Sequence, residues 1–410
     1  MKRICFGRCY GESQVLETVS RIDTISSFSS AASDANVTVL LLEPSVLYKF
    51  LTYHQEALIL KKGSKLSTFK ISHTTLNFGV TYEYHNIITQ DAFKAKMLLK
   101  GFHYVPSYKT CIYDSSKEQD VGHSFYTRSK WTVHLVEFVN ESNYFWHSAL
   151  PNDSCPMLPN REKFHFVENK GAFENLYADP LNNESNINLP SDPLNFLNQM
   201  RTSKFLDCHP ILTTTKKHPH EDKVAFIIQE MKRILHPYLI DFWLTSGTLL
   251  GWYRECGMIS YTTDVDFGMW AKDVQSVESL IKMFKSSESL KITTRFGFAE
   301  EALELSLNYK GLKTDIFFFY VEGKQAYVAC HFSSSFSYMK VLYPKFTLCS
   351  AEFFQEKVLV PCETKKILLA EYGPEWAKPI SEWNWKSSFS NKGPVIEWKE
   401  SRRKDVYQFF

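Results

Sequence analysis

The chain has 410 residues, of which 44% are hydrophobic and 22% are charged, and its formal net charge at pH 7 is +2. This is the composition of an ordinary globular protein, and a net charge so close to zero argues against nucleic acid as an obligate partner. The sequence contains no run of 18 or more apolar residues, so it predicts no membrane-spanning helix.

The first half of the chain, residues 1–205, is predicted to form a mixed α/β domain of its own, since the length suggests two or three domains. Strands are expected at residues 37–42 and 132–138, where apolar and β-branched residues are grouped. Residues 91–100 are expected to form a short helix, because an aspartate begins the segment and a glycine follows it. Residues 150–200 are rich in Pro, Asn, Asp and Ser, which predicts loops and a linker.

The second half, residues 220–410, alternates between helical and strand patterns, which predicts an α/β (α+β) domain with a mixed sheet. Its helices are expected where apolar residues recur on one face, and its strands where they are continuous or alternate with polar ones. The expected elements are, in order, a helix from Glu221, a strand at 242–245, a short helix at 249–252, a strand at 265–270, an amphipathic helix at 274–284, a half-buried strand at 303–308, a strand from Asp315 and a helix at 363–372.

Asp264 and Asp266 are the most informative residues of this half. Because they are separated by one residue on an expected strand, their carboxylates point to the same face. Such a pair holds a divalent cation through oxygen ligands, and that cation commonly also carries substrate phosphates. An Asp-x-Asp pair alone is weak evidence, but Asp315 precedes an uncharged run of six residues. A carboxylate beside an interior strand needs a partner, which is either a cation or a salt bridge to a neighbouring Lys or Arg.

These residues together resemble a known family. The small-residue turn Ser246-Gly247-Thr248, the pair Asp264 and Asp266, and Asp315 are similar to the pattern of nucleotidyltransferase-fold enzymes. The segment between them, Leu-Leu-Gly-Trp-Tyr-Arg at 249–254, resembles the LicD/fukutin family. The resemblance is strong over about residues 220 to 400 and is carried further by the segments 315–320, 343–349, 360–364, 371–376 and 383–386.

The resemblance implies a phosphotransferase with a nucleotidyltransferase-like catalytic domain at 220–410. The N-terminal domain would then serve as a stem, an interaction module or an acceptor-binding module. Members of the fukutin branch transfer ribitol 5-phosphate from CDP-ribitol to the O-mannosyl glycan of dystroglycan in the Golgi. The implied partners are therefore a CDP-alcohol, a glycan acceptor on a glycoprotein and other glycosylation enzymes. Fukutins also carry an N-terminal membrane anchor, which residues 1–12 do not resemble.

The expected compartment is accordingly the Golgi lumen in association with the membrane, or the cytosol if Met1 is the true start. Sequons for N-glycosylation, which are permissive for a luminal protein, occur at Asn36, Asn140, Asn152 and Asn183.

The expected mechanism places Mg²⁺ or Mn²⁺ on Asp264, Asp266 and Asp315, where the metal bridges the pyrophosphate of the CDP-activated donor. Asp315 is also the candidate base, or the group that orients the base. The backbone amides of Ser246, Gly247 and Thr248 are expected to cradle phosphate at a helix start. Two further candidates for phosphate contact, each of which is equally typical of a surface ion pair, are Arg254 and Lys345.

Three alternatives remain open at this point. The enzyme could transfer phosphocholine or glycerol phosphate, or it could be an Asp-x-Asp glycosyltransferase that uses a nucleotide sugar. A non-catalytic partner of a glycosylation complex is the third. The nine cysteines contain no Cys-x-x-Cys pair. Buried thiols or one disulfide are therefore favoured over a metal site at Cys330, Cys349 and Cys362 with His331.

Overall fold

A computed structural model describes residues 12–53, 74–105, 122–150, 164–182, 185–211, 218–380 and 383–410. The chain divides into two compact units, Met1–Met200 and Arg201–Phe410. The roles expected for residues 1–205 and 220–410 stay predictions. Two of the sequons, at Asn152 and Asn183, and four of the cysteines, at positions 5, 9, 111 and 155, lie outside the described residues.

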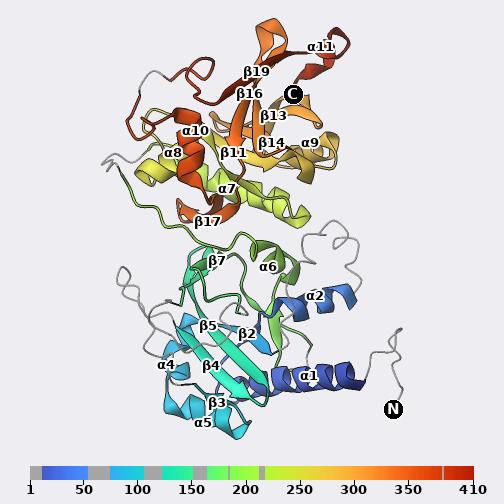
Figure 1. Cartoon of the computed structure of the whole chain (residues 1–410), viewed down its shortest axis with the longest axis vertical. Helices are drawn as coiled ribbons and strands as arrows, with labels where there is room; N and C mark the ends of the chain where they lie inside the picture. The colour runs from blue at the N-terminus through green and yellow to red at the C-terminus, as the bar shows by residue number, and fades with distance from the viewer. Residues whose placement is uncertain are drawn as a thin grey trace. The chain divides into compact units, whose positions relative to one another are not determined.

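Within its described residues, the N-terminal unit is built on one nine-stranded sheet in the order β3-β4-β5-β2-β1-β9-β8, to which β6 and β7 are added through β5. The central neighbours β2 and β5 run parallel and are almost wholly buried, while α1 packs beside α5 and α2 beside α6 (Figure 1). The strands are β1 (Leu40–Leu41), β2 (Thr75–Thr81), β3 (His103–Tyr104), β4 (His123–Arg128), β5 (Trp131–Glu141), β6 (Tyr144–His147), β7 (Gly171–Phe173), β8 (Ala178–Pro180) and β9 (Asn188–Pro190). The helices are α1 (Glu12–Ser33), α2 (Pro44–Tyr53), α4 (His85–Ile88), α5 (Asp91–Leu99) and α6 (Pro193–Gln199), with a 3₁₀ turn η2 (Tyr82–Tyr84).

The expected helix at 91–100 is confirmed as α5 and the strand at 132–138 as part of β5. The expected strand at 37–42 is only two residues long. The prediction of loops over 150–200 is wrong in part, because β7, β8, β9 and α6 lie there. Its polar residues serve as structural signals instead: the Asp192 carboxylate accepts a hydrogen bond from the Asn195 amide and caps α6.

The C-terminal unit has a second nine-stranded sheet in the order β19-β16-β15-β14-β13-β12-β20, with β11 paired to β14 and β10 to β11, and a separate hairpin β17-β18. The pairing of β11 with β14 is parallel and the other pairings are antiparallel, so the predicted α/β class with a mixed sheet is confirmed. The strands are β10 (Phe242–Leu244), β11 (Asp264–Trp270), β12 (Lys291–Phe298), β13 (Glu301–Tyr309), β14 (Leu312–Glu322), β15 (Gln325–Phe332), β16 (Ser337–Pro344), β17 (Leu348–Phe353), β18 (Glu356–Pro361), β19 (Lys392–Glu397) and β20 (Tyr407–Phe409). The helices are α7 (Glu221–Leu235), α8 (Ser246–Glu255), α9 (Val277–Lys285), α10 (Thr364–Tyr372) and α11 (Glu400–Val406), with α8 and α10 side by side (Figure 1).

Most elements expected for this unit are confirmed, and three differ in informative ways. The short helix at 249–252 is longer and begins at Ser246, so that its first turn faces the acids. The helix expected from 274 begins at Val277, because the Ser276 hydroxyl accepts a hydrogen bond from the Ser279 amide and caps it. Strand β13 was expected to be half-buried, but Glu304 and Ser306 on its polar face are also buried. Both faces of this strand are therefore inside the protein.

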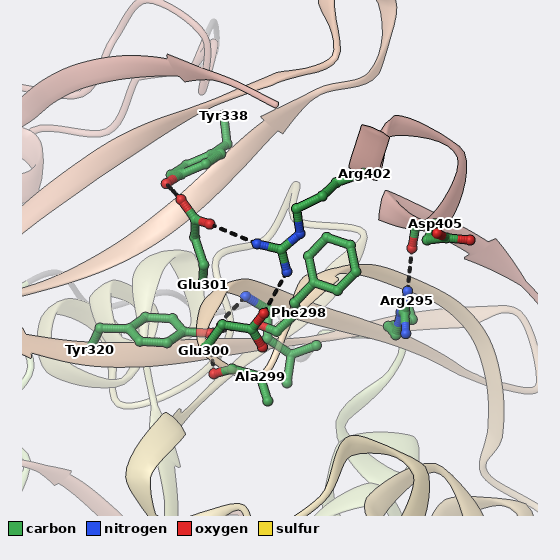
Figure 2. Close-up of polar contacts among 10 residues, drawn as sticks. Arg295, Phe298, Ala299, Glu300, Glu301, Tyr320, Tyr338, Arg402 and Asp405 are labelled. Atoms are coloured by element: carbon green, nitrogen blue, oxygen red, sulfur yellow. Dashed lines mark hydrogen bonds and ion pairs between the residues drawn. The ribbon is translucent and has the colours of Figure 1, made fainter. Parts of the chain in front are cut away.

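The C-terminal segment is attached to the β12–β13 turn by a cluster of charged and aromatic side chains (Figure 2). The guanidinium of Arg402 donates to Glu300 at 2.5 Å and to Glu301 at 3.3 Å, and it lies 3.7 Å from the ring centre of Phe298. The Tyr338 hydroxyl donates to the other oxygen of Glu301 at 2.6 Å. This cluster ties α11 to the start of β13, the strand that carries Glu304.

Cysteine chemistry differs from the expectation. Cys208 pairs with Cys256 and Cys349 with Cys362 in disulfides, while Cys330 is a free, buried thiol. Two disulfides are therefore present among the described residues, where at most one was expected. The metal site considered at Cys330, Cys349 and Cys362 is excluded, because two of its three sulfurs are bonded to each other. No helix among the described residues is both long enough and apolar enough to cross a membrane.

Candidate active site

The three carboxylates of the expected site meet on two neighbouring parallel strands. Asp264 and Asp266 lie on β11, and the register of β11 with β14 sets Asp266 directly beside Asp315. One carboxylate oxygen of each residue lies within 4.8 Å of the others. Asp315 is buried and the other two are partly exposed, whereas Val265 between them points into the core. Strand alternation together with parallel pairing thus gathers three negative charges at one place.

The first turn of α8 lies against this group of acids. A Cβ atom at Gly247 would come within 3.5 Å of an Asp266 carboxylate oxygen, so the glycine allows the backbone to approach closely. Ser246 has a left-handed φ of 47°. The Thr248 hydroxyl accepts a hydrogen bond from the Asp266 amide at 2.8 Å, which fixes the turn to β11. The positive end of α8 and the carboxylates therefore face the same space.

That space is a cavity of about 590 Å³. All three aspartates, Ser246 and Gly247 line it, and so do groups to which the sequence analysis gave no part in this site. The additional lining residues include Glu304, Lys313, Cys330, His331, Glu371, Tyr372, Trp376, Trp383 and Trp385. The cavity combines an acidic floor with an aromatic wall, and it is large enough for a nucleotide-sized ligand.

Negative charge accumulates in the cavity and shifts its acids toward the protonated form. Burial, followed by the charges of Asp264 and Asp315, raises the pKa of Asp266 well above its ordinary value. Burial and the charge of Asp315 raise the pKa of Glu304 to about 8. Burial alone raises the pKa of Glu371 to about 7, against hydroxyl groups nearby that lower it. Without a bound cation these carboxyls hold protons that ordinary carboxyls would have lost.

Lys313 is the cation nearest to the three aspartates. Its Nζ atom lies 2.5 Å from Oδ2 of Asp315, while the Ser306 hydroxyl donates to Oδ1 at 2.7 Å. Burial lowers the pKa of Lys313, but the charges of Asp315 and Glu304 outweigh it and the net pKa is raised. The salt bridge that was one alternative for Asp315 is thus present. Because the Lys313 side chain is 54% exposed, it has room to turn toward a ligand in the cavity.

Arg254 and Lys345, the two side chains expected to contact phosphate, have different surroundings in the structure. Arg254 lines the cavity, but its guanidinium is buried and donates to the Glu255 carboxylate at 2.6 and 3.0 Å. A third donation goes to the carbonyl oxygen of Trp376 at 3.4 Å. Lys345 is exposed and is not among the residues that line the cavity. A phosphate-binding role for either residue stays a prediction, and by position Lys313 is the better placed cation.

Glu371 is the group that sequence reasoning missed most completely. It is fully buried at the end of α10, and the Tyr343 hydroxyl donates to its Oε2 at 3.0 Å. Its Oε1 has no hydrogen-bond partner within bonding geometry, although the hydroxyls of Ser246 and Tyr372 are near enough to lower its pKa. A buried carboxylate with an unpaired oxygen on a cavity wall is costly, and such groups are commonly functional. Its signals in the sequence were a polar residue on the otherwise apolar end of a helix and its place in the segment 371–376, which carries part of the family resemblance.

Comparison with known proteins gives a consistent picture. Residues 239–363 match the family described as LicD/FKTN/FKRP, nucleotidyltransferase domain. The chain is 34% identical over 295 residues to a human protein named ribitol-5-phosphate transferase FKTN, an alignment that covers 68% of this chain and 63% of that protein. A mouse protein of the same name is 35% identical over the same length and coverage. An uncharacterized protein of Caenorhabditis elegans is 27% identical over 240 residues, which cover 55% of this chain and 63% of that protein. The chain thus spans somewhat less than two thirds of the length of these curated relatives.

Proposed function

Since residues 239–363 belong to the LicD/FKTN/FKRP nucleotidyltransferase family, we propose that the chain is a phosphotransferase that moves ribitol 5-phosphate from CDP-ribitol to a glycan hydroxyl. The observation that carries the proposal is the group of three carboxylates beside the first turn of α8. The names of the human and mouse relatives support the choice of ribitol phosphate. The acceptor is a dystroglycan-type O-mannosyl glycan, which places the reaction in the Golgi lumen, at the membrane and beside other glycosylation enzymes.

The donor set fits Mg²⁺ or Mn²⁺. Three carboxylate oxygens within 4.8 Å of one another are hard ligands, and two of the three residues are open to the cavity, which leaves positions for phosphate oxygens. The raised pKa of Asp266 supports the same assignment, because mutual repulsion of this kind is relieved by a cation. When bound, such an ion neutralises charge on the donor's pyrophosphate and on the departing CMP.

The residues of the chain then bind and orient the reactants. The amides of Gly247 and Thr248 at the start of α8 donate to phosphate oxygens, and Lys313 turns from Asp315 toward the same charge. The acceptor oxygen loses its proton to Asp315 or to a group that Asp315 orients. That oxygen forms a new bond to the phosphorus of ribitol phosphate while the bond from phosphorus to CMP breaks. CMP leaves with the electron pair.

Phosphocholine transfer is the second candidate, and one observation favours it. Trp376, Trp383 and Trp385 line the cavity, and aromatic rings around a pocket bind quaternary ammonium groups through cation–π contacts. A ribitol chain has no positive charge and would contact these rings only through its C–H groups.

The test is a donor comparison with purified full-length chain and a glycopeptide acceptor. CDP-ribitol, CDP-glycerol, CDP-choline and a UDP-sugar are supplied separately with Mg²⁺ or Mn²⁺, and release of the nucleotide is measured together with the mass of the acceptor. Transfer from CDP-ribitol alone supports the proposal, and transfer from CDP-choline alone supports the second candidate. Absence of transfer from every donor would instead indicate the non-catalytic role.

A further inference from the structure

A second cavity, of about 560 Å³, lies in the N-terminal unit. It opens where the parallel strands β2 and β5 both end, since Thr81 of β2 and the end of β5 at Val139 and Asn140 line it. The carboxyl ends of parallel strands form the edge at which α/β sheets commonly hold ligands. Nothing in the proposed transfer chemistry uses this cleft, which is separate from the acidic cavity described above.

Aromatic rings held in fixed positions form much of its wall. Tyr82 stacks on His85 with ring centres 4.9 Å apart, and His85 in turn contacts the buried carboxylate of Glu137 at 2.7 Å. Tyr177 is 55% exposed, and its ring stands edge-to-face on buried Phe145 at 5.3 Å. Both tyrosines are therefore supported from behind by other side chains. A ligand that stacks on them finds rings already ordered, which reduces the entropy lost on binding.

Short polar side chains complete the cleft. The Tyr84 hydroxyl donates to the Thr38 hydroxyl at 3.3 Å, and the Thr81 hydroxyl donates to the Glu83 carboxylate at 2.7 Å. The Asn140 amide lies at the rim and is exposed. Hydroxyl and amide groups both donate to and accept from alcohol groups, and a carboxylate accepts from them, so the polar part of the wall matches a ligand with many hydroxyls.

Charge decides between the ligands that such a wall could hold. Over the ranges that the structure describes, no Lys, Arg or His lines this cleft, and Glu83 adds a negative charge. A phosphate or a nucleotide would find no cation there and would be repelled by the carboxylate. A sugar ring suits both parts of the wall, because its C–H face is apolar and its edge is hydroxylated. We infer that this cleft binds a neutral oligosaccharide, with Tyr177 and Tyr82 stacking on the sugar rings.

The experiment uses full-length chain from bacteria, which carries no N-glycans, and neutral probes: lactose, N,N′-diacetylchitobiose and mannotriose. Saturation-transfer NMR and titration calorimetry should detect binding of at least one of them, with a dissociation constant on the order of 1 mM. Tyr177→Ala should weaken that binding about tenfold, because it removes a stacking ring. The matched control is Tyr238→Ala, which removes a tyrosine that is 51% exposed in the other unit and should leave binding unchanged.

Three results would overturn the inference. The first is no binding of any neutral probe to a protein whose thermal unfolding is native. The second is tighter binding of mannose 6-phosphate than of mannose. The third concerns Asn140, which belongs to a sequon at the rim. If secreted protein binds no probe while secreted Asn140→Gln protein does, the cleft holds the chain's own glycan and does not bind a separate oligosaccharide. The inference does not depend on the proposed transfer, because binding and CMP release are measured separately.

Discussion

Replacement of Asp266 by asparagine tests whether the three carboxylates are arranged to hold a cation. The change removes one negative charge at nearly constant volume, and the backbone hydrogen bond to Thr248 remains. Two unit charges 4.8 Å apart, the limit of the separation found here, repel each other by about 3.5 kcal/mol at an effective dielectric constant of 20. Because Asp266 has two such neighbours, the metal-free protein should become more stable when its charge is lost, by as much as a few kcal/mol.

The stability that Asp266→Asn gains over the native protein without metal should depend on pH in a defined direction. Burial and the charges of Asp264 and Asp315 raise the pKa of Asp266 in the folded protein, whereas the unfolded chain keeps a value of about 3.9. Between these two values the folded protein binds more protons than the unfolded chain. The free energy of unfolding of the native protein therefore falls as pH rises, by up to about 1.4 kcal/mol per pH unit. Asparagine does not titrate, so the advantage of the variant in EDTA should grow from pH 4 upward until the folded pKa is passed.

The assay is urea unfolding at several pH values, with EDTA and with Mg²⁺ or Mn²⁺, together with CMP release. The native protein should gain about 2.7 kcal/mol at a metal concentration a hundred times the dissociation constant. Asp266→Asn should gain almost nothing from metal and should not transfer. Asp405→Asn, at an exposed acid on α11 (Figure 2), is the matched control and should behave as native protein does. A variant that is less stable than native protein in EDTA at pH 8, or that keeps full transfer, would refute the reasoning.

Four further predictions concern other groups. Turnover should stop in EDTA and return with Mg²⁺ or Mn²⁺, and metal-independent transfer would contradict the proposed metal site. Asp315→Asn should abolish turnover in a protein with a native circular dichroism spectrum. Glu371→Gln should remove an ionisation near pH 7 from the pH profile of kcat/KM, because burial raises the pKa of this carboxyl to about 7; an unchanged profile would exclude it from turnover. Arg402→Met should lower the free energy of unfolding by about 1–2 kcal/mol, since it loses two carboxylate contacts and two ring contacts, while CMP release stays native. Endoglycosidase treatment of the product from its own cells should shift its mobility, because Asn36 is an exposed sequon that does not line the cleft of the N-terminal unit; no shift together with diffuse cytosolic imaging would contradict the luminal compartment.

The pairing of Asp264 with Asp266 was readable from the sequence because it depends on a local rule, whereas their grouping with Asp315 was indicated there by the family resemblance. Two carboxylates at i and i+2 share a face of any strand, and Asp315 at the start of an uncharged run had to lie near the edge of an interior strand. Only the parallel register that sets Asp266 beside Asp315 needed the structure. The turn at the start of α8 was also readable from local residues, since a glycine between small residues after a short strand is typical of a helix start that binds phosphate.

The rest of the cavity depends on distant pairing, which no local pattern reveals. Glu304 was assigned to the solvent side of β13 by its alternation with leucines, yet that face covers the acids and is buried. Glu371 comes from a helix 56 residues beyond Asp315 in the sequence. Arg254 was a candidate either for phosphate contact or for a surface ion pair, but α8 places its ion pair with Glu255 inside the protein. Each of these outcomes is set by how elements pack on one another and not by the segments themselves.

Charge balance links the binding of metal and donor at the acidic cavity. When all three aspartates are ionised, three carboxylates and the Lys313 ammonium leave two negative charges, which one divalent cation would neutralise. The diphosphate of a CDP-alcohol then adds two more negative charges, while the cations that line the described part of the cavity, Lys313, Arg254 and Lys378, are each already paired with a carboxylate. Of these pairs, only that of Lys313 uses a carboxylate of the proposed metal site, so a donor that draws Lys313 away leaves Asp315 to the metal. In that case the donor increases the affinity of the site for metal, and by reciprocity the metal increases the affinity for the donor to the same extent.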